Sequence, residues 1–150
     1  MKPADTQVLL ALGVLKFIQR DYMGASVYFA QGIKENPTDH SMWNKYGACF
    51  SNSLNTKKAI ECYEQALDLR PNYIRCITNI GLAHNNMADY KAAANCFLNA
   101  LMLNPKLLNV WTYARTAFIQ MNRWDLLEKL EKRDPNLFRD EFLLIDPKQI

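Results

Sequence analysis

The sequence predicts an all-α protein, built as a solenoid of stacked antiparallel helix pairs with a capping helix region at its carboxy terminus. Two series of residues support this prediction, because prolines and glycines each recur at intervals of 34 residues. The two series are Pro37, Pro71 and Pro105, and Gly13, Gly47 and Gly81. A fixed period of about 20 to 50 residues is typical of repeat proteins, in which each unit buries its apolar face against its neighbours. No segment carries a strand signal that would argue against helices.

Large, small and aromatic residues also hold fixed places within the period. The second repeat has Trp43, Tyr46, Phe50, Ala59 and Tyr63, and the third has Ile77, Ile80, His84, Ala93 and Phe97 at the same places. A unit of this length, with this order of residues and a closing proline, is the pattern of the tetratricopeptide repeat. The small residues let two helices approach closely, and the aromatic side chains fill the space between them.

Polar residues predict the turn inside each helix pair. Asp21, Asn55 and Asp89 recur with the same period, and a short polar side chain at this place can cap the second helix. Each pair is expected to end before its proline, because the residue that precedes a proline is pushed out of the helical region. The first three predicted repeats cover residues 5–38, 39–72 and 73–106.

A fourth repeat, over residues 107–133, begins on the pattern and then loses it. Trp111, Ala114 and Phe118 match, whereas Arg115 stands where the earlier repeats have glycine. Loss of the pattern is typical of a terminal capping repeat, whose outer face meets water. The predicted domains are thus the repeats over residues 5–133 and a capping tail over residues 134–150, expected to form one more short helix. The tail residues expected to face inward are Leu137, Phe138, Phe142 and Leu143.

Apolar residues cover nearly every side of the first predicted helix. They are Val8, Leu9, Leu10, Leu12, Val14, Leu15, Phe17 and Ile18. A helix that is apolar all round is normally buried on more than one side. We therefore expect another repeat to precede it, so that the chain is the carboxy-terminal part of a longer protein. The alternative is self-association through this helix.

Composition limits the classes of partner. The 150 residues carry a net charge of +3 without a run of basic residues, so no nucleic-acid patch is predicted. No apolar run approaches the ~18 residues of a membrane span, and the amino terminus does not resemble a signal peptide. A soluble intracellular protein is expected.

The cysteines are predicted to be structural, His84 is expected to pack in the core or at the edge of the groove, and His40 is expected to be solvated. Cys62 and Cys96 share one repeat position beside the inter-helix aromatic, where a reduced thiol packs as a small hydrophobe. No pair of cysteines has the spacing of metal ligands. The sequence has no recognisable nucleophile–base pair, paired-carboxylate motif or glycine-rich phosphate loop, so neither enzymatic activity nor a cofactor is expected.

The first helix of each pair is expected to line a concave groove. The groove stripe reads Asn44, Ala48 and Asn52 in the second repeat, with Lys45 beside it, and Arg75, Asn79 and Asn86 in the third. A carboxamide offers donors and an acceptor, so a row of asparagines can bracket the backbone of an extended peptide without reading its side chains. Lys45 and Arg75 suit a terminal carboxylate, which needs both charge and donors. The alternative is a solvated helix face that simply tolerates Asn, Lys and Arg.

Four stretches resemble, in the same order, stretches of the peroxisomal targeting signal type 1 receptor family. They are residues 12–15, residues 43–48 with Asn52, residues 72–75 with 79–81 and Asn86, and residues 109–111 with Arg115. The corresponding family stretches read LGVL, WNKLGA…N, YIR…NLG…N and NIW…LR. The likeness runs from about residue 5 to residue 142, and it is more specific than the repeat pattern alone.

This resemblance implies a receptor that binds the extreme carboxy terminus of cargo ending in Ser-Lys-Leu-like tripeptides, the address read for peroxisomes. The implied roles are backbone and carboxylate binding by Asn44, Asn79 and Asn86, positive charge from Lys45 and Arg75, room for the terminal leucine at Ala48, and completion of the amide row by Asn52. The resemblance also implies a cytoplasmic receptor that cycles to the peroxisomal membrane. Its membrane docking partners would bind through regions absent here, and the family's earlier group of repeats is absent too.

Two other interpretations fit the residues. One is a general tetratricopeptide adaptor that binds another protein's carboxy terminus, although a chaperone-type clamp would need more Lys and Arg along the groove. The other is the helical arm of a larger enzyme, because some glycosyltransferases have repeat arms lined by asparagine. The placement of Lys45 and Arg75 and the decay of the fourth repeat favour the receptor.

Overall fold

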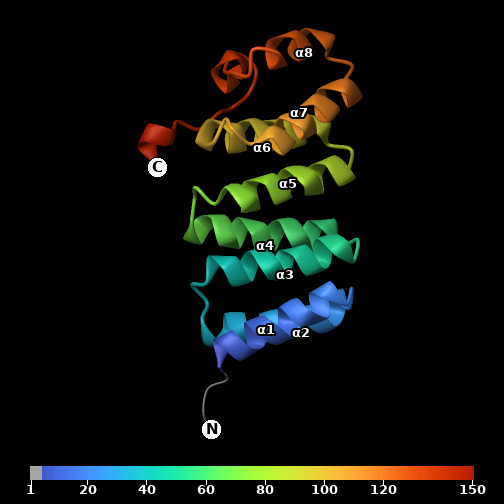
Figure 1. Ribbon diagram of the computed structural model, residues 1–150, viewed down its shortest axis with the longest axis vertical. Coiled ribbons are helices and arrows are strands. Elements are labelled where there is room, and N and C mark those ends of the chain that lie inside the picture. Colours follow the sequence, from blue (N-terminus) through green and yellow to red (C-terminus); the bar gives the residue numbers. More distant parts are fainter. Residues whose placement is uncertain (1–4) are drawn as a thin grey trace. The chain divides into compact units, whose positions relative to one another are not determined.

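The computed structural model describes residues 5–150, which are all helical or irregular and include no strand (Figure 1). The chain divides into two compact units, Met1–Pro71 and Asn72–Ile150. The first unit holds α1 (Thr6–Ile18), α2 (Tyr22–Glu35), α3 (His40–Asn52) and α4 (Thr56–Leu69). The second holds α5 (Ile74–Asn86), α6 (Tyr90–Leu103), α7 (Leu108–Gln120), α8 (Trp124–Leu130) and two 3-10 helices, η1 (Pro135–Phe138) and η2 (Pro147–Gln149). The all-α fold class is confirmed.

Close approach within each helix pair depends on the periodic glycines. A Cβ atom at Gly47 would lie 2.7 Å from the ring of Tyr63, and one at Gly81 would lie 2.5 Å from the ring of Phe97. Both aromatic rings belong to the second helix of the same pair, as the repeat pattern predicts. Any side chain at these two positions would therefore push the helices apart or displace a buried ring.

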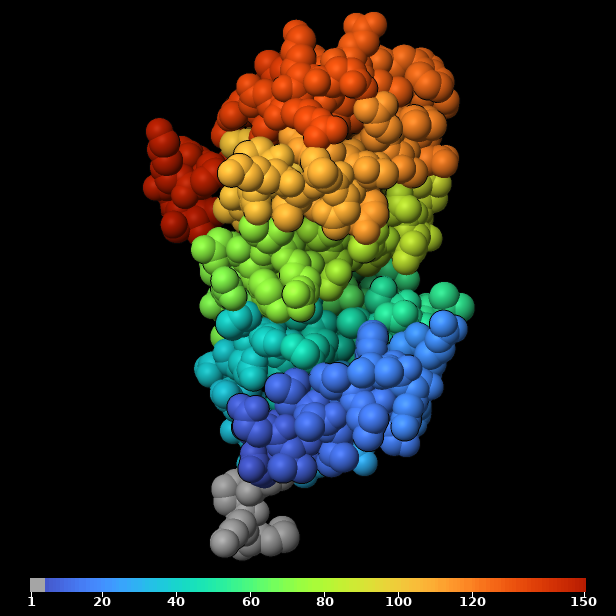
Figure 2. All heavy atoms as spheres, in the orientation of Figure 1, coloured from blue at the N-terminus to red at the C-terminus, as the bar shows by residue number. Residues whose placement is uncertain are grey.

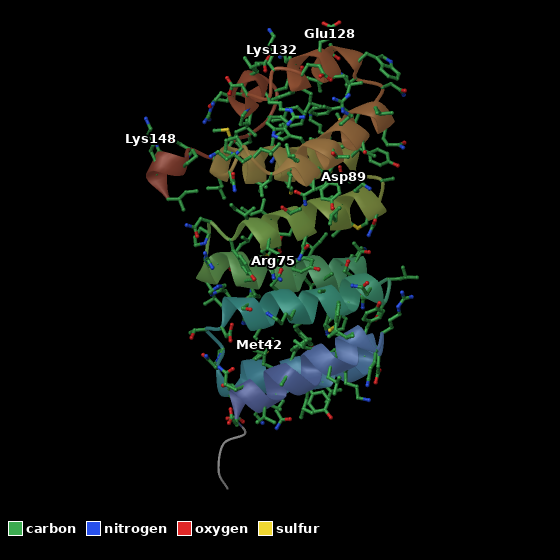
Figure 3. All side chains as sticks on the ribbon, viewed as in Figure 1. Met42, Arg75, Asp89, Glu128, Lys132 and Lys148 are labelled. Carbon is green, nitrogen blue, oxygen red and sulfur yellow. The ribbon has the colours of Figure 1, made fainter. Side chains whose placement is uncertain are left out.

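The core of the first unit joins consecutive pairs through Met42 (Figure 3). Its side chain reaches α2, where a Cβ atom at Gly32 would lie 2.7 Å from the Met42 methyl carbon. The neighbouring Trp43 donates its indole N–H to the carbonyl of Pro37 at 2.9 Å. In the second unit Trp111 makes the same bond to Pro105, at 2.8 Å. Within each unit, the hydrogen bond from the tryptophan to the carbonyl of the recurring proline thus joins one helix pair to the next.

The predicted caps of the second helices are confirmed. The Asp21 carboxylate accepts a hydrogen bond from the backbone N–H of Gly24 at 2.9 Å, which lowers the pKa of Asp21. Asn55 and Asp89 accept the equivalent bonds at the starts of α4 and α6, at 3.4 and 3.3 Å. The fourth repeat has Arg123 at this place, without a side-chain cap, and its second helix α8 has only seven residues.

The residue before the N-cap of each second helix adopts a left-handed conformation. The residues are Arg20, Leu54, Ala88 and Asn122, with φ of 62°, 63°, 60° and 56°. A left-handed conformation costs an ordinary L-residue roughly 1–2 kcal/mol and costs glycine nothing. The turn geometry of the repeat therefore persists into the decayed fourth repeat, although none of the four residues is the glycine that would reveal it.

Replacing Leu54 with glycine is expected to stabilise the first unit by about 0.5–1 kcal/mol. The side chain of Leu54 is 92% exposed, so its removal loses little packing, whereas the strain at φ 63° is relieved. The measurement is the midpoint of urea unfolding, with Lys57→Gly as a control at an exposed position inside α4, where glycine costs about 1 kcal/mol. A lower midpoint for Leu54→Gly would contradict this account of the turn.

The first helix leaves part of its apolar surface uncovered. Leu9 and Gly13 are buried against the rest of the first unit. Val8, Leu15 and Ile18 are exposed, and so are Met23 and Val27 of α2. Burial of α1 on more than one side is therefore not observed within the described residues 5–150.

The tail closes the second unit with aromatic side chains. Phe138 and Phe142 are buried, and their ring centroids lie 5.5 and 5.9 Å from that of Phe118 in α7. Their predicted inward orientation is confirmed. The same expectation for Leu143 is wrong, because this side chain is 87% exposed. The chain turns through η1, and no helix continues through Leu143. The helical geometry that would have turned the Leu143 side chain inward is therefore absent.

The last part of the tail is held by a carboxamide of α6 and by the guanidinium of Arg139. Asn99 donates its side-chain N–H to the carbonyl of Leu143 at 3.1 Å and accepts the backbone N–H of Ile145 at 2.8 Å. The Arg139 guanidinium adds bonds to the carbonyls of Leu144 and Ile145, both at 3.3 Å. Figure 2 shows the last residues, in dark red, standing beside this part of the second unit.

Ion pairs fasten the tail to α8. The Arg123 guanidinium bonds the carboxylates of Glu141 and Asp125 at 2.7 and 2.6 Å, and Lys129 bonds Asp140 at 2.9 Å. The hydrogen bond from Arg123 lowers the pKa of Asp125 to about 2 and lowers the pKa of Glu141, and the bond from Lys129 lowers the pKa of Asp140. A lowered carboxyl pKa stabilises the folded state above the usual pKa of about 4, and the gain is lost as the pH falls through the lowered value.

We therefore expect the stability of the second unit to fall between about pH 5 and pH 2, and Glu141→Gln to reduce that fall. The measurement is the urea midpoint as a function of pH. Glu128→Gln is the matched control, on the outer face of α8 (Figure 3), and it should leave the pH profile as in the wild type. Because these carboxylates are exposed, the difference should shrink in 1 M salt. Identical pH profiles for Glu141→Gln and the wild type would contradict the prediction.

Candidate functional site

Three of the predicted site residues line one cavity of the first unit. Asn44, Lys45 and Ala48 of α3 face Val14 and Phe17 of α1 across a cavity of about 210 Å³, and Phe29 of α2 completes its wall. We call this the α3 cavity. Met42, which packs into the core, lies on the opposite side of α3 from Asn44, whereas Gly47 lies on the same side, three residues along the helix. Helical spacing places Asn44 and Ala48 on one face of α3, as the sequence predicts, and Asn44 is itself buried there.

The surface of the α3 cavity is almost entirely apolar, although Asn44 and Lys45 are among the residues that line it. Asn44 is only 4% exposed, so its carboxamide is buried rather than in bulk water. The Lys45 ammonium donates to the hydroxyl of Ser41 at 2.6 Å, which fixes it near the start of α3. A small apolar cavity with a few fixed polar groups can bury one aliphatic side chain and orient the backbone that carries it.

Two further predicted residues line a cavity of the second unit. Arg75 and Asn79 of α5 face Asn109 and Tyr113 of α7 across about 400 Å³. We call this the α5–α7 cavity; Figure 3 labels Arg75. Thr78 lies between the two polar residues of α5, and the remaining wall is apolar: Ile74, Leu82, Leu107 and Val110. No aspartate or glutamate lines either the α3 cavity or the α5–α7 cavity.

The structure does not bring the last two predicted residues into either cavity. Asn52 and Asn86 end α3 and α5, and both side chains are exposed. The carboxamide of Asn52 turns back onto its own helix and donates to the carbonyl of Ala48 at 2.8 Å. That bond holds the amide close to the α3 stripe without directing it into the cavity.

Asn109 and Tyr113 are cavity residues that the amide stripe alone does not identify. They follow Arg75 and Asn79 by one repeat length each, since 109 − 75 and 113 − 79 are both 34. Extending the stripe by one further period would have placed both residues on the groove. The fourth repeat loses the pattern at its glycine and later positions, yet its first helix contributes to the same cavity wall as α5.

The nucleophilic and metal-binding side chains are arranged for structure. Burial raises the pKa of the Cys49 and Cys76 thiols to about 12 and that of Cys62 and Cys96 to about 11, so all four are protonated near neutral pH. Among residues 5–150, no group of three or more His, Cys, Asp and Glu side chains is placed to hold a metal ion. Over the same residues, no helix has the length and apolar character needed to span a membrane.

Comparison with known proteins places the chain among repeat proteins. A tetratricopeptide repeat profile matches residues 40–73 and 74–107. Among solved structures, the first such domain of Spaghetti (RPAP3), bound to the HSP90 peptide SRMEEVD, has a TM-score of 0.76. That match is 16% identical in sequence and covers 81% of this chain and 97% of that one, so it shows the fold alone.

Curated relatives are named as receptors. The peroxisomal targeting signal receptor of Kluyveromyces lactis is 32% identical over 150 residues, which cover 92% of this chain and 26% of that protein. The peroxisomal targeting signal 1 receptor of Dictyostelium discoideum is 36% identical over 138 residues, covering 92% of this chain and 21% of that protein. The chain thus spans about a quarter of the length of these relatives. The chain carries tetratricopeptide repeats over residues 40–107 and is similar to the peroxisomal targeting signal receptors over most of its length.

Proposed function

We propose that this chain is the peptide-binding part of an import receptor for cargo proteins that end in Ser-Lys-Leu-type peroxisomal targeting signals. The observation that supports this most strongly is the content of the two cavities. Asn44 and Lys45 line the α3 cavity of the first unit, Arg75 and Asn79 line the α5–α7 cavity of the second, and no carboxylate lines either cavity. Such a set of groups favours a ligand with a peptide backbone and a free terminal carboxylate.

In the first unit, the α3 cavity would take the side chain of the terminal leucine. Ala48 keeps the floor of the cavity open, while Val14 and Phe17 supply apolar contact. Lys45 lies on the same helix turn as Asn44, so a carboxylate next to the buried leucine would meet a cation and a carboxamide together. Asn52 would continue this amide row at the end of α3.

In the second unit, Asn79 would bond the peptide backbone or carboxylate, and Arg75 would supply positive charge. Asn86 would continue the row at the end of α5. The same chain offers a precedent for this chemistry, because Asn99 holds the extended tail by one donated and one accepted hydrogen bond, of 3.1 and 2.8 Å. A carboxamide on a helix of this fold can therefore bracket an extended backbone in the way proposed for Asn44 and Asn79.

We also propose that the receptor works in the cytoplasm and cycles to the peroxisomal membrane. The exposed apolar residues of α1, among them Val8, Leu15 and Ile18, offer a surface for self-association. The alternatives are a general adaptor for carboxy termini and the helical arm of a larger enzyme, and they predict different peptide selectivity.

The test is a fluorescence-polarisation titration with a labelled peptide ending in Ser-Lys-Leu and with the same peptide amidated at its carboxy terminus. The free acid should bind about tenfold or more tightly, because the amide loses charge-assisted hydrogen bonds worth roughly 1.5–3 kcal/mol. A peptide of the same composition in scrambled order is the control. Equal binding of acid and amide would contradict the receptor assignment and favour the adaptor.

A further inference from the structure

The first helix of the decayed repeat, α7, forms one wall of the α5–α7 cavity. Its contribution is Asn109 and Tyr113, which face Arg75 and Asn79 of α5. In the proposed function, Arg75 and Asn79 bind the backbone and the carboxylate of the peptide. The two α7 residues have no role in it. We infer that Asn109 and Tyr113 select one side chain of the bound peptide, and that this side chain is a hydrogen-bond acceptor rather than a cation. The inference rests on the proposed function, since it concerns a second property of the same site.

The groups around the cavity are rich in donors. A guanidinium has five N–H groups, each of the two carboxamides has two, and the phenol of Tyr113 has one. The Thr78 hydroxyl already donates to the carbonyl of Ile74 at 3.0 Å. Because no aspartate or glutamate lines the cavity, its acceptors are limited to amide, phenol and hydroxyl oxygens. A peptide carboxylate or carboxamide would find several donors there, whereas a lysine ammonium would meet the positive charge of Arg75.

The α7 wall is held in place by the core. The ring of Tyr113 packs on that of Phe97, with centroids 5.5 Å apart, so its hydroxyl has a defined position. Val110 and Trp111, on the same helix, are buried in the second unit. A rigid wall can discriminate between side chains, because a mismatched group cannot be accommodated by moving the helix.

The repeat register also relates the two walls of the α5–α7 cavity. Asn109 and Tyr113 occupy the places that Arg75 and Asn79 occupy one repeat earlier. Equivalent positions of consecutive first helices therefore face one another across a single cavity within the second unit. The change from Arg75 to Asn109 keeps hydrogen-bond donors and removes the charge, which suits a wall that reads a side chain rather than the carboxylate.

The test uses the full chain and labelled peptides ending in Ser-Lys-Leu. The serine and each of the three residues before it are replaced in turn by Asp, Asn and Lys. At one position Asp and Asn should bind about 5- to 10-fold more tightly than Lys. That preference should fall at least threefold in Asn109→Leu and in Tyr113→Phe, which removes only the hydroxyl. Thr112→Ala, at an exposed place on α7 outside the cavity wall, should keep it.

The outcomes separate this inference from the proposed function. The acid-to-amide ratio of each variant should stay as in the wild type, because neither Asn109 nor Tyr113 is among the residues proposed to bind the carboxylate. Uniform weakening of all peptides by the α7 variants, unchanged preference, or no positional preference in the wild type would overturn the inference while leaving the receptor assignment in place. Equal binding of acid and amide by the wild type would instead contradict the proposed function. Failure of the wild type to bind any peptide would overturn both.

Discussion

Asn79→Leu should weaken binding of a peptide ending in Ser-Lys-Leu by at least tenfold and abolish the preference for the free acid over the amide. Asn79 lies half-buried in the wall of the α5–α7 cavity, beside Arg75. Leucine has a similar volume but no hydrogen-bonding group, so a carboxylate or backbone carbonyl brought against it would be left without a partner. Loss of a hydrogen bond to a charged group costs roughly 1.5–3 kcal/mol, which corresponds to about 10- to 150-fold in affinity.

The control for this substitution is on the same helix. Asn85 is also half-buried on α5 but does not line the cavity, so Asn85→Leu should bind both peptides as the wild type does. Circular dichroism of both variants checks that α5 remains folded. If Asn79→Leu kept the full difference between acid and amide, the carboxamide would not be reading the carboxy terminus, and Asn79 would have to be removed from the site.

Phe138→Ala is expected to destabilise the second unit by about 3–5 kcal/mol, the largest effect of a single core substitution in the tail. The Phe138 side chain is fully buried, and its ring lies 5.5 Å from that of Phe118 and 6.5 Å from that of Phe142. Removing it leaves a cavity beside the two remaining rings, Phe118 and Phe142. The measurement is the free energy of unfolding from urea titration.

Leu143→Ala is the matched control, five residues further along the same tail. Because Leu143 is 87% exposed, its truncation should change the free energy of unfolding by less than about 0.5 kcal/mol. A large effect of Leu143→Ala, or a small effect of Phe138→Ala, would mean that the tail does not close the second unit as described. Together the two variants ask whether the tail is part of the folded unit or an appendage.

The features that could be predicted from the sequence are those set by the period. Gly47 and Gly81 recur because each faces an aromatic ring sixteen residues later, Tyr63 and Phe97, and these pairs form inside one helix pair. Asp21 and its equivalents cap the following helix through bonds three residues along the chain. Such features depend on neighbours close in sequence, so a regular pattern of residues is enough to locate them.

Other features depend on contacts that the period does not record. Leu54 and Ala88 adopt the left-handed turn without being glycine, so the turn leaves no mark in composition. Leu143 is exposed because Asn99, more than forty residues earlier, holds the tail in an extended conformation. Apolar residues at helical spacing give no sign of such a long-range bond. The sequence therefore predicts a helix through the tail.

Only part of the candidate site could be predicted from the sequence, because the hydrogen bonds of individual carboxamides leave no pattern in it. Asn44 and Asn79 sit on a stripe that helical geometry alone defines, and each lines a cavity. Asn52 lies on the same stripe, but at the end of α3 its carboxamide bonds the carbonyl of Ala48, a local choice that the stripe does not specify. Asn109 and Tyr113 also line the α5–α7 cavity, because its wall is set by position in the repeat rather than by residue type.

The most direct measurement is an NMR titration that follows the side-chain NH₂ resonances of Asn44 and Asn79, assigned with Asn→Leu variants. Addition of a peptide ending in Ser-Lys-Leu should shift both pairs of resonances at the concentration that saturates binding, and the amidated peptide should shift them much less. Asn122, in the exposed turn before α8, supplies an internal reference that should not move. Binding of the free acid with both pairs of resonances unmoved would contradict the claim that these carboxamides hold the end of another protein.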